Sequence, residues 1–353
     1  MKISVCMIVK NEELQLGRAL TSIPISCEVI IVDTGSTDRT IAIARETGAR
    51  VYEYEWRHHF ADARNFSVKQ ATGDYIFIMD ADEQLFENWE CAVNEHLARF
   101  PDQASAVMIH NITEGDLTVH HGVRLFPNNG KYVFRGNVHE QLYNEEELAQ
   151  PIHSAIKLNH YGYSKEQYES KGKFERYVHL YREALIQDPN NGYMLYQLGK
   201  LYYSLNQFKE AYEPLSAAVM QQQFDRLYYP PLLVMFGYTL KELNNSNQAY
   251  ELLLPLASKY PKFPDLYFQL GILAMETGRF NQIESHYKQA LAIGDTDRYT
   301  TVCGCGSYRA AHNLGVFYEV SGRIKEACEY YKLAAVQQFQ PSIQRLTEHL
   351  KKS

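Results

Sequence analysis

The sequence predicts an α/β domain with a mixed, mostly parallel sheet, followed by an all-helical array of repeats. Strand-length apolar runs alternate with helical segments over residues 1–165, whereas from residue 166 onward Tyr, Leu, Ala and Gln recur at helical spacing. The length of 353 residues also exceeds that of a usual single domain. We therefore expect an α/β domain at 1–165, a linking helix or degenerate leading repeat at 166–189, and about four repeats at 190–353.

Composition and charge exclude several classes of function. The chain is 45% hydrophobic and 22% charged, as in ordinary globular proteins, and its net charge of -7 argues against nucleic acid or an anionic membrane as a partner. Six cysteines at irregular spacing indicate reduced thiols rather than a disulfide framework. The N-terminus begins directly in a strand, and no apolar run approaches the roughly 18 residues of a membrane span. We expect a cytoplasmic protein, with a homodimer as a possible assembly.

The first part begins with the alternation strand, helix, strand, helix, strand. The expected elements are a strand at 3–9, a helix ending near 23, a strand at 28–32, a helix at 39–47 and a strand at 49–54. Gly48 is a suitable helix terminator, and Ser36 to Asp38 are suitable N-cap residues. This alternation is typical of a parallel sheet with right-handed crossovers, which binds nucleotides in many proteins but assigns no chemistry by itself.

A pair of carboxylates follows the most apolar run of this part. Residues 75–79 (Tyr-Ile-Phe-Ile-Met) predict a buried strand that leads into Asp80 and Asp82, at the sheet edge where ligands bind in α/β folds. On an extended backbone the two side chains leave on the same side and repel one another unless a cation lies between them. A hard divalent metal that carries phosphate oxygens would satisfy both. A simple acidic turn is the alternative.

Four segments in one order carry a resemblance. They are Ser-Val-Cys-Met-Ile-Val-Lys-Asn-Glu-Glu at 4–13, Val-Asp-Thr-Gly-Ser-Thr-Asp at 32–38, Phe-Ala-Asp-Ala-Arg-Asn at 60–65 and Met-Asp-Ala-Asp at 79–82. Together they resemble a family 2 glycosyltransferase of the Rossmann-like GT-A fold, over about the first 165 residues. The resemblance implies metal-dependent, inverting transfer from a nucleotide-sugar, with a UDP-sugar preferred.

The resemblance also implies roles for individual residues. Asp82 would bind Mn2+ or Mg2+ directly, and Asp80 would reach the metal through water or hold the ribose. Asp33 matches the family's nucleobase or ribose contact, Arg64 would reach the base or the diphosphate, and Ile8 would line the nucleotide-sugar site. A helix N-cap is the alternative for Asp33, and a solvated charge on a helix is the alternative for Arg64.

The acceptor side is expected after residue 130. Gly136 and Glu140 match the family's glycine loop and the acid that follows it, and an inverting transfer needs a base opposite the departing diphosphate. Family members often have an aspartate preceded by another acid at this place. This chain has Val-His-Glu at 138–140, so Glu140 is the candidate base, and His139 is either a rival base or a buried structural histidine.

A late histidine completes the expected site. His160 resembles the place where GT-A enzymes carry a histidine on the metal or the diphosphate, since imidazole suits Mn2+ and also donates to phosphate. The pairs His58-His59 and His120-His121 have no such support, so we expect them on loops or on the surface.

The helical part carries the pattern of tetratricopeptide repeats. Gly199, Gly237, Gly271 and Gly315 head aligned copies at spacings of 38, 34 and 44, against an ideal of about 34. In such arrays the first helices line a concave groove, where rigid aromatics suit an extended peptide; plain helix packing is the alternative. The aromatic side chains expected there are Tyr193, Tyr196, Tyr203, Tyr238 and Phe268.

The two resemblances together imply an acceptor. Family 2 enzymes fused to tetratricopeptide arrays include peptide S-glycosyltransferases, which implies a peptide or protein acceptor on Cys, Ser or Thr. A cell-surface glycan or a lipid-linked intermediate is the alternative within the same class. An inactive transferase domain that serves as an interaction scaffold, and a nucleotidyltransferase that releases pyrophosphate, are alternatives from other classes.

Overall fold

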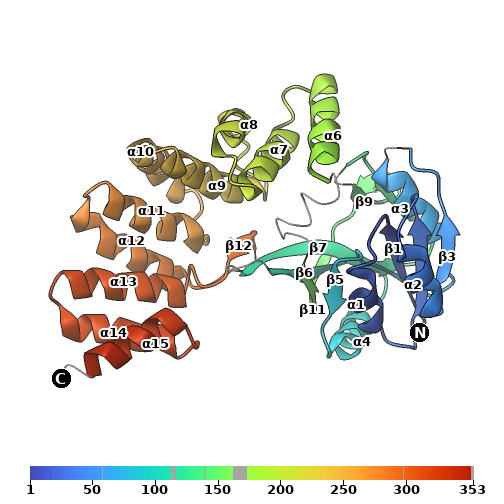
Figure 1. Ribbon diagram of the computed structural model, residues 1–353, viewed down its shortest axis with the longest axis horizontal. Coiled ribbons are helices and arrows are strands. Elements are labelled where there is room, and N and C mark those ends of the chain that lie inside the picture. The colour runs from blue at the N-terminus through green and yellow to red at the C-terminus, as the bar shows by residue number, and fades with distance from the viewer. Residues whose placement is uncertain (58, 113–116, 139, 162–172, 297, 351–353) are drawn as a thin grey trace. The chain divides into compact units, whose positions relative to one another are not determined.

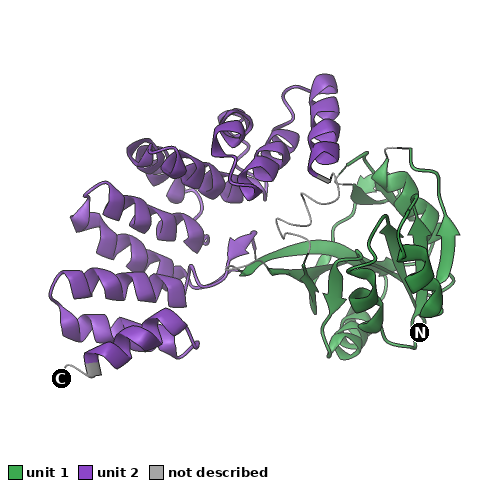
Figure 2. Ribbon diagram, in the orientation of Figure 1, with its two compact units in different colours: residues 1–173 green, residues 174–353 purple. Residues whose placement is uncertain are grey.

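The computed structural model describes the chain except residues 58, 113–116, 139, 162–172, 297 and 351–353 (Figure 1). The chain divides into two compact units, residues 1–173 and 174–353 (Figure 2). The first unit is α/β and the second is helical, as the sequence predicts.

The first unit is built on a mixed sheet with the strand order β3-β2-β1-β4-β7-β6-β11-β5. Its strands are β1 (Ile3–Val9), β2 (Glu28–Asp33), β3 (Arg50–Glu53), β4 (Tyr75–Ile78), β5 (Glu83–Leu85), β6 (Ser105–Ile112), β7 (Leu117–Pro127) and β11 (Ile152–His160). Strands β1 to β4 run parallel, and β7 is antiparallel to both of its neighbours. This arrangement confirms the expected mixed, mostly parallel sheet.

Helices cover both faces of the sheet. The helices are α1 (Leu16–Thr21), α2 (Thr40–Glu46), α3 (Phe60–Lys69) and α4 (Trp89–Arg99). Buried side chains of α1, α2 and α4 pack with alternate residues of β1 such as Val5 and Met7, whereas Ala61 of α3 packs on the opposite face with Cys6. The alternation along β1 follows from the two-residue period of a strand. The sheet therefore separates two cores.

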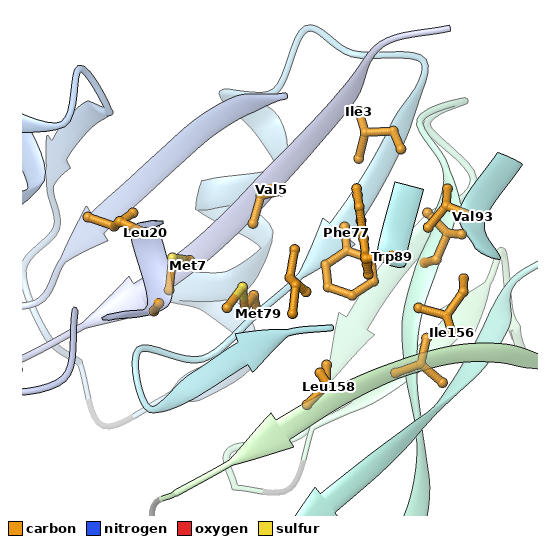
Figure 3. Close-up of a cluster of buried hydrophobic side chains, with 14 of the residues drawn as sticks. Ile3, Val5, Met7, Leu20, Phe77, Met79, Trp89, Val93, Ile156 and Leu158 are labelled. Carbon is orange, nitrogen blue, oxygen red and sulfur yellow. The ribbon is translucent and has the colours of Figure 1, made fainter. Parts of the chain in front are cut away.

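The larger core joins the strands that carry the predicted site. Figure 3 shows Phe77 of β4, Trp89 of α4 and Leu158 of β11 in this cluster, and the rings of Phe77 and Trp89 meet edge to face at 5.1 Å. Fully burying a side chain of this size stabilises a fold by about 1.5–3 kcal/mol. Apolar packing within this core thus holds in place the strands whose ends bear the candidate site residues.

A small second sheet lies against α3. Its strands are β8 (Tyr132–Arg135), β9 (Gln141–Asn144) and β10 (Glu147–Leu148), antiparallel in the order β10-β9-β8. The side-chain amide of Asn65 donates to the carbonyl of Phe134 and accepts from its N–H, both at 2.8 Å. The segment that carries the predicted base is therefore tied to α3.

The second unit consists of paired helices. They are α6 (Lys173–Gln187), α7 (Gly192–Ser204), α8 (Phe208–Met220), α9 (Tyr229–Glu242), α10 (Ser246–Ala257), α11 (Pro264–Glu276), α12 (Phe280–Ile293), α13 (Tyr308–Val320), α14 (Ile324–Ala335) and α15 (Gln340–Leu350). The expected glycines lie in α7, α9, α11 and α13. A Cβ at Gly271 would come within 2.6 Å of the Tyr287 ring of α12, and one at Gly237 within 2.6 Å of Leu253 of α10. The glycines thus allow the two helices of a repeat to touch.

None of the helices in the described part of the chain is long and apolar enough to cross a membrane.

The first prediction concerns Glu28, which ties three strands together at the edge of the sheet. Its carboxylate accepts from the Ser4 hydroxyl, from the N–H and hydroxyl of Thr72 at 2.8 Å each, and from Arg50 Nη1 at 2.6 Å. Burial alone would raise the pKa of Glu28, but these donors outweigh it and lower the pKa from 4.5 to about 2. The stabilisation is therefore complete above pH 4.5 and is lost as the pH falls through the folded-state pKa of about 2.

We expect Glu28→Gln to lower the free energy of unfolding by about 2 kcal/mol at neutral pH, because hydrogen bonds to a charged group are lost. Urea denaturation at a series of pH values checks this, and the difference from wild type should shrink as the solution is acidified. The control is Glu46→Gln, whose partner Arg39 is exposed, and for which we expect a change within about 0.5 kcal/mol. A pH-independent difference for Glu28→Gln would contradict the assignment.

The second prediction concerns helix contact in the repeats. Gly271→Ala places a methyl group against the Tyr287 ring, and we expect a loss of about 1–3 kcal/mol of stability from overpacking. Gly17→Ala is the matched control, since it also lies in a helix but has nothing within 4 Å of the added Cβ. Thermal denaturation of both variants compares them. Equal melting temperatures would show that the repeat glycine is not a packing requirement.

Candidate active site

The loops that follow β1 and β2 interlock at the carboxyl edge of the sheet. Asn11 has a positive φ of 54°, its N–H donates to Ser36 Oγ at 2.9 Å, and its Oδ1 accepts from the N–H of Thr37 at 2.8 Å. These bonds keep residues 10–13 out of the helix, so α1 begins only at Leu16 rather than directly after the strand. The floor of the site is thus formed by two strand ends that are hydrogen-bonded to one another.

Asp33 presents a single unused acceptor on this floor. The residue is 2% exposed, and its Oδ2 accepts from the N–H groups of Gly35 and Ser36 at 2.9 Å each. Its Oδ1 is buried without a hydrogen-bond partner among the described residues. The register pairs Asp33 with Val9, and the preceding Ile8 is the one residue of β1 that is not fully buried. An unsatisfied buried carboxylate oxygen is costly, which marks this position as one that a ligand donor would complete.

Five charged side chains form a row across the site, which we call the charge row: Glu140, Arg64, Asp80, Arg124 and Glu83. Arg64 Nε donates to Glu140 at 2.6 Å and Arg64 Nη2 to Asp80 Oδ1 at 3.4 Å. Arg124 Nη2 donates to Asp80 Oδ2 at 3.0 Å and to Glu83 Oε1 at 2.6 Å. The signs alternate along the row, so every carboxylate in it has a guanidinium neighbour.

The charge row shifts the ionisation of its members. Burial raises the pKa of Glu83; the Arg124 guanidinium opposes this shift and the Asp80 carboxylate adds to it. Burial would also raise the pKa of Asp80, but Arg124 and Arg64 outweigh it and hold that pKa below its usual range. Arg124 is itself held in its charged form, because the two carboxylates raise its pKa more than burial lowers it. Asp80 is therefore a carboxylate at neutral pH.

The register of the sheet and the pitch of helix α3 bring the members of the charge row together. The antiparallel pair β4 and β7 sets Phe77 opposite Leu125, which brings Arg124 next to the turn that carries Asp80. Helix α3 begins where the N–H of Phe60 donates to the carbonyl of Asn137 at 3.0 Å, and Arg64 lies one turn further along. The alternative of a solvated Arg64 is wrong, because this side chain is buried at 7% exposure.

Asp82 and His160 meet beside the charge row. His160 Nε2 lies 3.5 Å from Asp82 Oδ1, and His160 is paired with Glu83 where β11 meets β5. The buried amide of Asn111 directs its nitrogen toward the carbonyl and hydroxyl of Thr118, so its Oδ1 faces His160 Nδ1 at 3.0 Å. Since an amide oxygen only accepts, Nδ1 must carry a proton. Nε2 then faces Asp82, with a lone pair in a neutral His160 or with a second N–H in an imidazolium.

This arrangement bears on the expected metal. Among the described residues there is no group of three or more His, Cys, Asp or Glu arranged to hold a metal ion. Of the three expected ligands, Asp82 and His160 lie together, whereas both oxygens of Asp80 contact arginines. Carboxylate oxygen and imidazole nitrogen both bind divalent cations, and one or two protein ligands completed by phosphate oxygens are typical of Mg2+ sites. The donor set of Asp82 and His160 therefore fits two ligands of a divalent cation.

The remaining predicted residues are placed as follows. Glu140 lies between β8 and β9, next to Arg64, whereas His139 falls outside the described residues. His120 was expected on a loop or at the surface, but it lies in β7, where its Nδ1 is 2.9 Å from the amide nitrogen of Asn111. The sequence feature that could have placed His120 in a strand is the strand-like pattern of the residues around the pair His120-His121.

The sequence interpretation missed three residues of the site. Arg124 and Glu83 complete the charge row, and Asn111 orients His160. Two sequence features could have identified the charged pair. Arg124 lies between the apolar Val123 and Leu125, and Glu83 directly follows the carboxylate pair; a charge that is buried needs a partner.

The aromatic residues expected to face a groove divide into two groups. Tyr196 and Phe268 are buried among the helices, whereas Tyr193, Tyr203 and Tyr238 are partly exposed. The rings of Tyr193, Tyr196 and Tyr228 contact one another at centroid distances of 5.3 to 6.4 Å.

Two family models and several known proteins are similar to parts of this chain. Residues 4–144 match the model of glycosyl transferase family 2, and residues 170–233 match a tetratricopeptide-repeat model. A TPR repeat-containing protein of Synechococcus elongatus is 31% identical over 248 residues, which cover 66% of this chain and 61% of that protein. The chain thus spans less than two thirds of that relative.

Two further matches cover different shares of this chain. The SPbeta prophage-derived glycosyltransferase SunS of Bacillus subtilis is 27% identical over 333 residues, which cover 91% of this chain and 78% of SunS. Among solved structures, that of MamA matches 51% of this chain and 97% of its own at 22% identity, with a TM-score of 0.41.

The third prediction tests the charge row. Arg64→Met leaves Glu140 and Asp80 without one guanidinium, and breaking a buried ion pair by removing one partner costs about 3–5 kcal/mol. The double variant Arg64→Met/Glu140→Gln removes the uncompensated charge, and we expect it to recover most of that loss. Urea denaturation compares the two. If single and double variants are equally destabilised, packing rather than charge holds Arg64 in place.

Proposed function

We propose that this chain, whose residues 4–144 belong to glycosyl transferase family 2, transfers a sugar from a UDP-sugar to a peptide or protein held by its tetratricopeptide repeats. The observation that carries the proposal is the position of Arg64. Its guanidinium joins Asp80, on the loop expected to bind the donor, to Glu140, the expected base, in one partly buried contact. Donor binding and acceptor activation would therefore occur within one side-chain length of each other.

The unused oxygen of Asp33 supports a uracil base. Oδ2 is already occupied by two backbone N–H groups, so only Oδ1 is left to accept from a ligand. The imide edge of uracil offers one ring N–H donor and guanine offers two adjacent donors, whereas cytosine and adenine offer an exocyclic amino donor beside a ring-nitrogen acceptor. One buried acceptor therefore suits uracil, and thymine has the same edge. The family resemblance favours UDP over dTDP.

The diphosphate would lie beside Arg64 and the pair of Asp82 and His160. Arg64 Nη1 is buried without a partner among the described residues, so it can donate to a phosphate oxygen. Asp82 and His160 would hold Mn2+ or Mg2+. A bound divalent cation supplies Lewis-acid stabilisation of the negative charge on the leaving diphosphate.

Glu140 would act on the acceptor. Its carboxylate takes the proton from an acceptor hydroxyl or thiol as that oxygen or sulfur forms a bond to the anomeric carbon. The bond between the anomeric carbon and the diphosphate oxygen breaks at the same time, and its electron pair leaves with the nucleoside diphosphate. Single displacement inverts the anomeric centre. His139, which lies outside the described residues, stays the rival base.

The acceptor part of the proposal is supported by the repeats. SunS, which is named a glycosyltransferase, aligns over 91% of this chain and therefore over both units. The partly exposed Tyr193, Tyr203 and Tyr238 offer rigid aromatic surface with polar tips, which suits an extended peptide. A soluble peptide that carries Cys, Ser or Thr is the acceptor to test first.

The fourth prediction is that the chain consumes a UDP-sugar slowly in the absence of acceptor and in the presence of Mn2+. We expect UDP release from a panel of UDP-, dTDP- and GDP-sugars to favour UDP, and EDTA to abolish it. We expect Asp82→Ala and Glu140→Gln to lower the rate at least about 100-fold, because they remove a metal ligand and a general base.

Arg279→Gln is the control for these variants, since it breaks an ion pair with Glu251 within the repeat unit. It should release UDP at the wild-type rate. If no nucleotide-sugar is consumed with any divalent metal, the transferase proposal fails. If a sugar is transferred to a glycan or lipid-linked acceptor but not to peptides, only the acceptor assignment fails.

A further inference from the structure

The turn that carries Asp80 and Asp82 closes around a buried carboxylate. The N–H of Glu83 donates to the carbonyl of Asp80 at 3.1 Å, and Glu83 Oε2 accepts from the N–H of Asp80 at 2.8 Å. Glu83 is 1% exposed, so its charge has little contact with water. The conformation of the turn therefore depends on what balances Glu83.

Arg124 supplies that balance and also contacts Asp80. One nitrogen, Nη2, lies 2.6 Å from Glu83 Oε1 and 3.0 Å from Asp80 Oδ2. The two carboxylates are thereby held on either side of one donor, which fixes the direction in which the Asp80 side chain leaves the turn. Arg124 Nε is buried without a hydrogen-bond partner among the described residues.

Two arginines hold the Asp80 carboxylate, one at each oxygen. Oδ2 contacts Arg124 and Oδ1 contacts Arg64, and the side chain is still 36% exposed. Arg124 therefore leaves part of the Asp80 carboxylate accessible while it limits rotation about the side-chain bonds. A group held in this way is ordered before a ligand binds, which lowers the entropic cost of binding.

We propose that Arg124 is a positioning residue for the nucleotide-sugar: through its contact with Asp80 it sets the orientation in which that carboxylate meets the donor. This inference rests on the proposed function. Arg124 itself touches neither the reacting atoms nor the acceptor in this scheme. The competing explanation is that Arg124 only neutralises Glu83 and so keeps the unit folded.

The fifth prediction separates the two explanations. They differ in whether adding Glu83→Gln to Arg124→Gln restores only the melting temperature or also kcat/KM. Arg124→Gln alone leaves the buried Glu83 carboxyl without its counter-charge, which costs stability whether Glu83 stays ionised or takes up a proton. We expect it to lower both the melting temperature and kcat/KM for the UDP-sugar, the latter about 100-fold with a raised KM. In Arg124→Gln/Glu83→Gln the unbalanced charge is gone, and we expect the melting temperature to recover while KM and kcat/KM stay impaired. If kcat/KM recovers together with the melting temperature, Arg124 only neutralises Glu83 and the inference is overturned.

A second comparison tests the route through Asp80. If Arg124 acts by orienting that carboxylate, Arg124→Gln should lower kcat/KM much less in an Asp80→Asn background than in wild type. Equal losses in both backgrounds would overturn the inference. Because one nitrogen makes both contacts, Arg124→Lys should restore much of the activity. Arg279→Gln serves again as the control that should leave donor consumption unchanged.

The failure of this inference is distinguishable from failure of the proposed function. Wild-type consumption of a UDP-sugar tests the proposed function alone. If wild type consumes no donor, the affinity of UDP with Mn2+ is measured by calorimetry for wild type and the same Arg124, Glu83 and Asp80 variants, and weaker binding in the double variant supports the inference. If wild type does not bind UDP either, both are overturned.

Discussion

The charge row is the interaction on which the candidate active site depends. A charge buried alone is so costly that it would be neutralised or expelled, but an alternating row gives each carboxylate a guanidinium and each guanidinium at least one carboxylate. Glu140 and Glu83 stand at its two ends, and Asp80 lies between two arginines. The row therefore connects the expected base to the loop expected to bind the donor, and no single member is independent of its neighbours.

The sheet explains how so polar a row is tolerated. Alternate residues of β1 and β4 supply two apolar cores, so the strand ends are held by packing that does not involve the site. Helix α3 then uses two consecutive residues for different purposes, since Arg64 enters the row while Asn65 holds the backbone of Phe134. The hairpin that carries Glu140 is thereby fixed to the same helix that carries its counter-charge.

The repeat unit follows a simpler constraint. Each helix pair needs a residue without a side chain where the helices cross, and Gly237 and Gly271 meet Leu253 and Tyr287 at these points. Tyrosine satisfies two requirements in this unit, because its ring fills the contact between helices while its hydroxyl stays available for a polar partner. Tyr196 is buried among the helices, whereas Tyr203 is partly exposed. The presence of a tyrosine in this unit therefore does not by itself identify a binding surface.

The sequence by itself determined the two-part architecture, the strand ends and the acids they carry, because these features depend on local periodicity and on residues adjacent in the chain. Asp80 and Asp82 were placed after a strand in this way, whereas the roles expected of Asp33 and Glu140 came from the family resemblance. Only the tertiary structure decided which charges meet. Arg124 reaches Asp80 because β7 pairs with β4 in one particular antiparallel register, and Asn111 reaches His160 because β6 lies beside β11. Register between distant strands follows from side-chain packing across the whole sheet, and it leaves no periodic signal in the sequence.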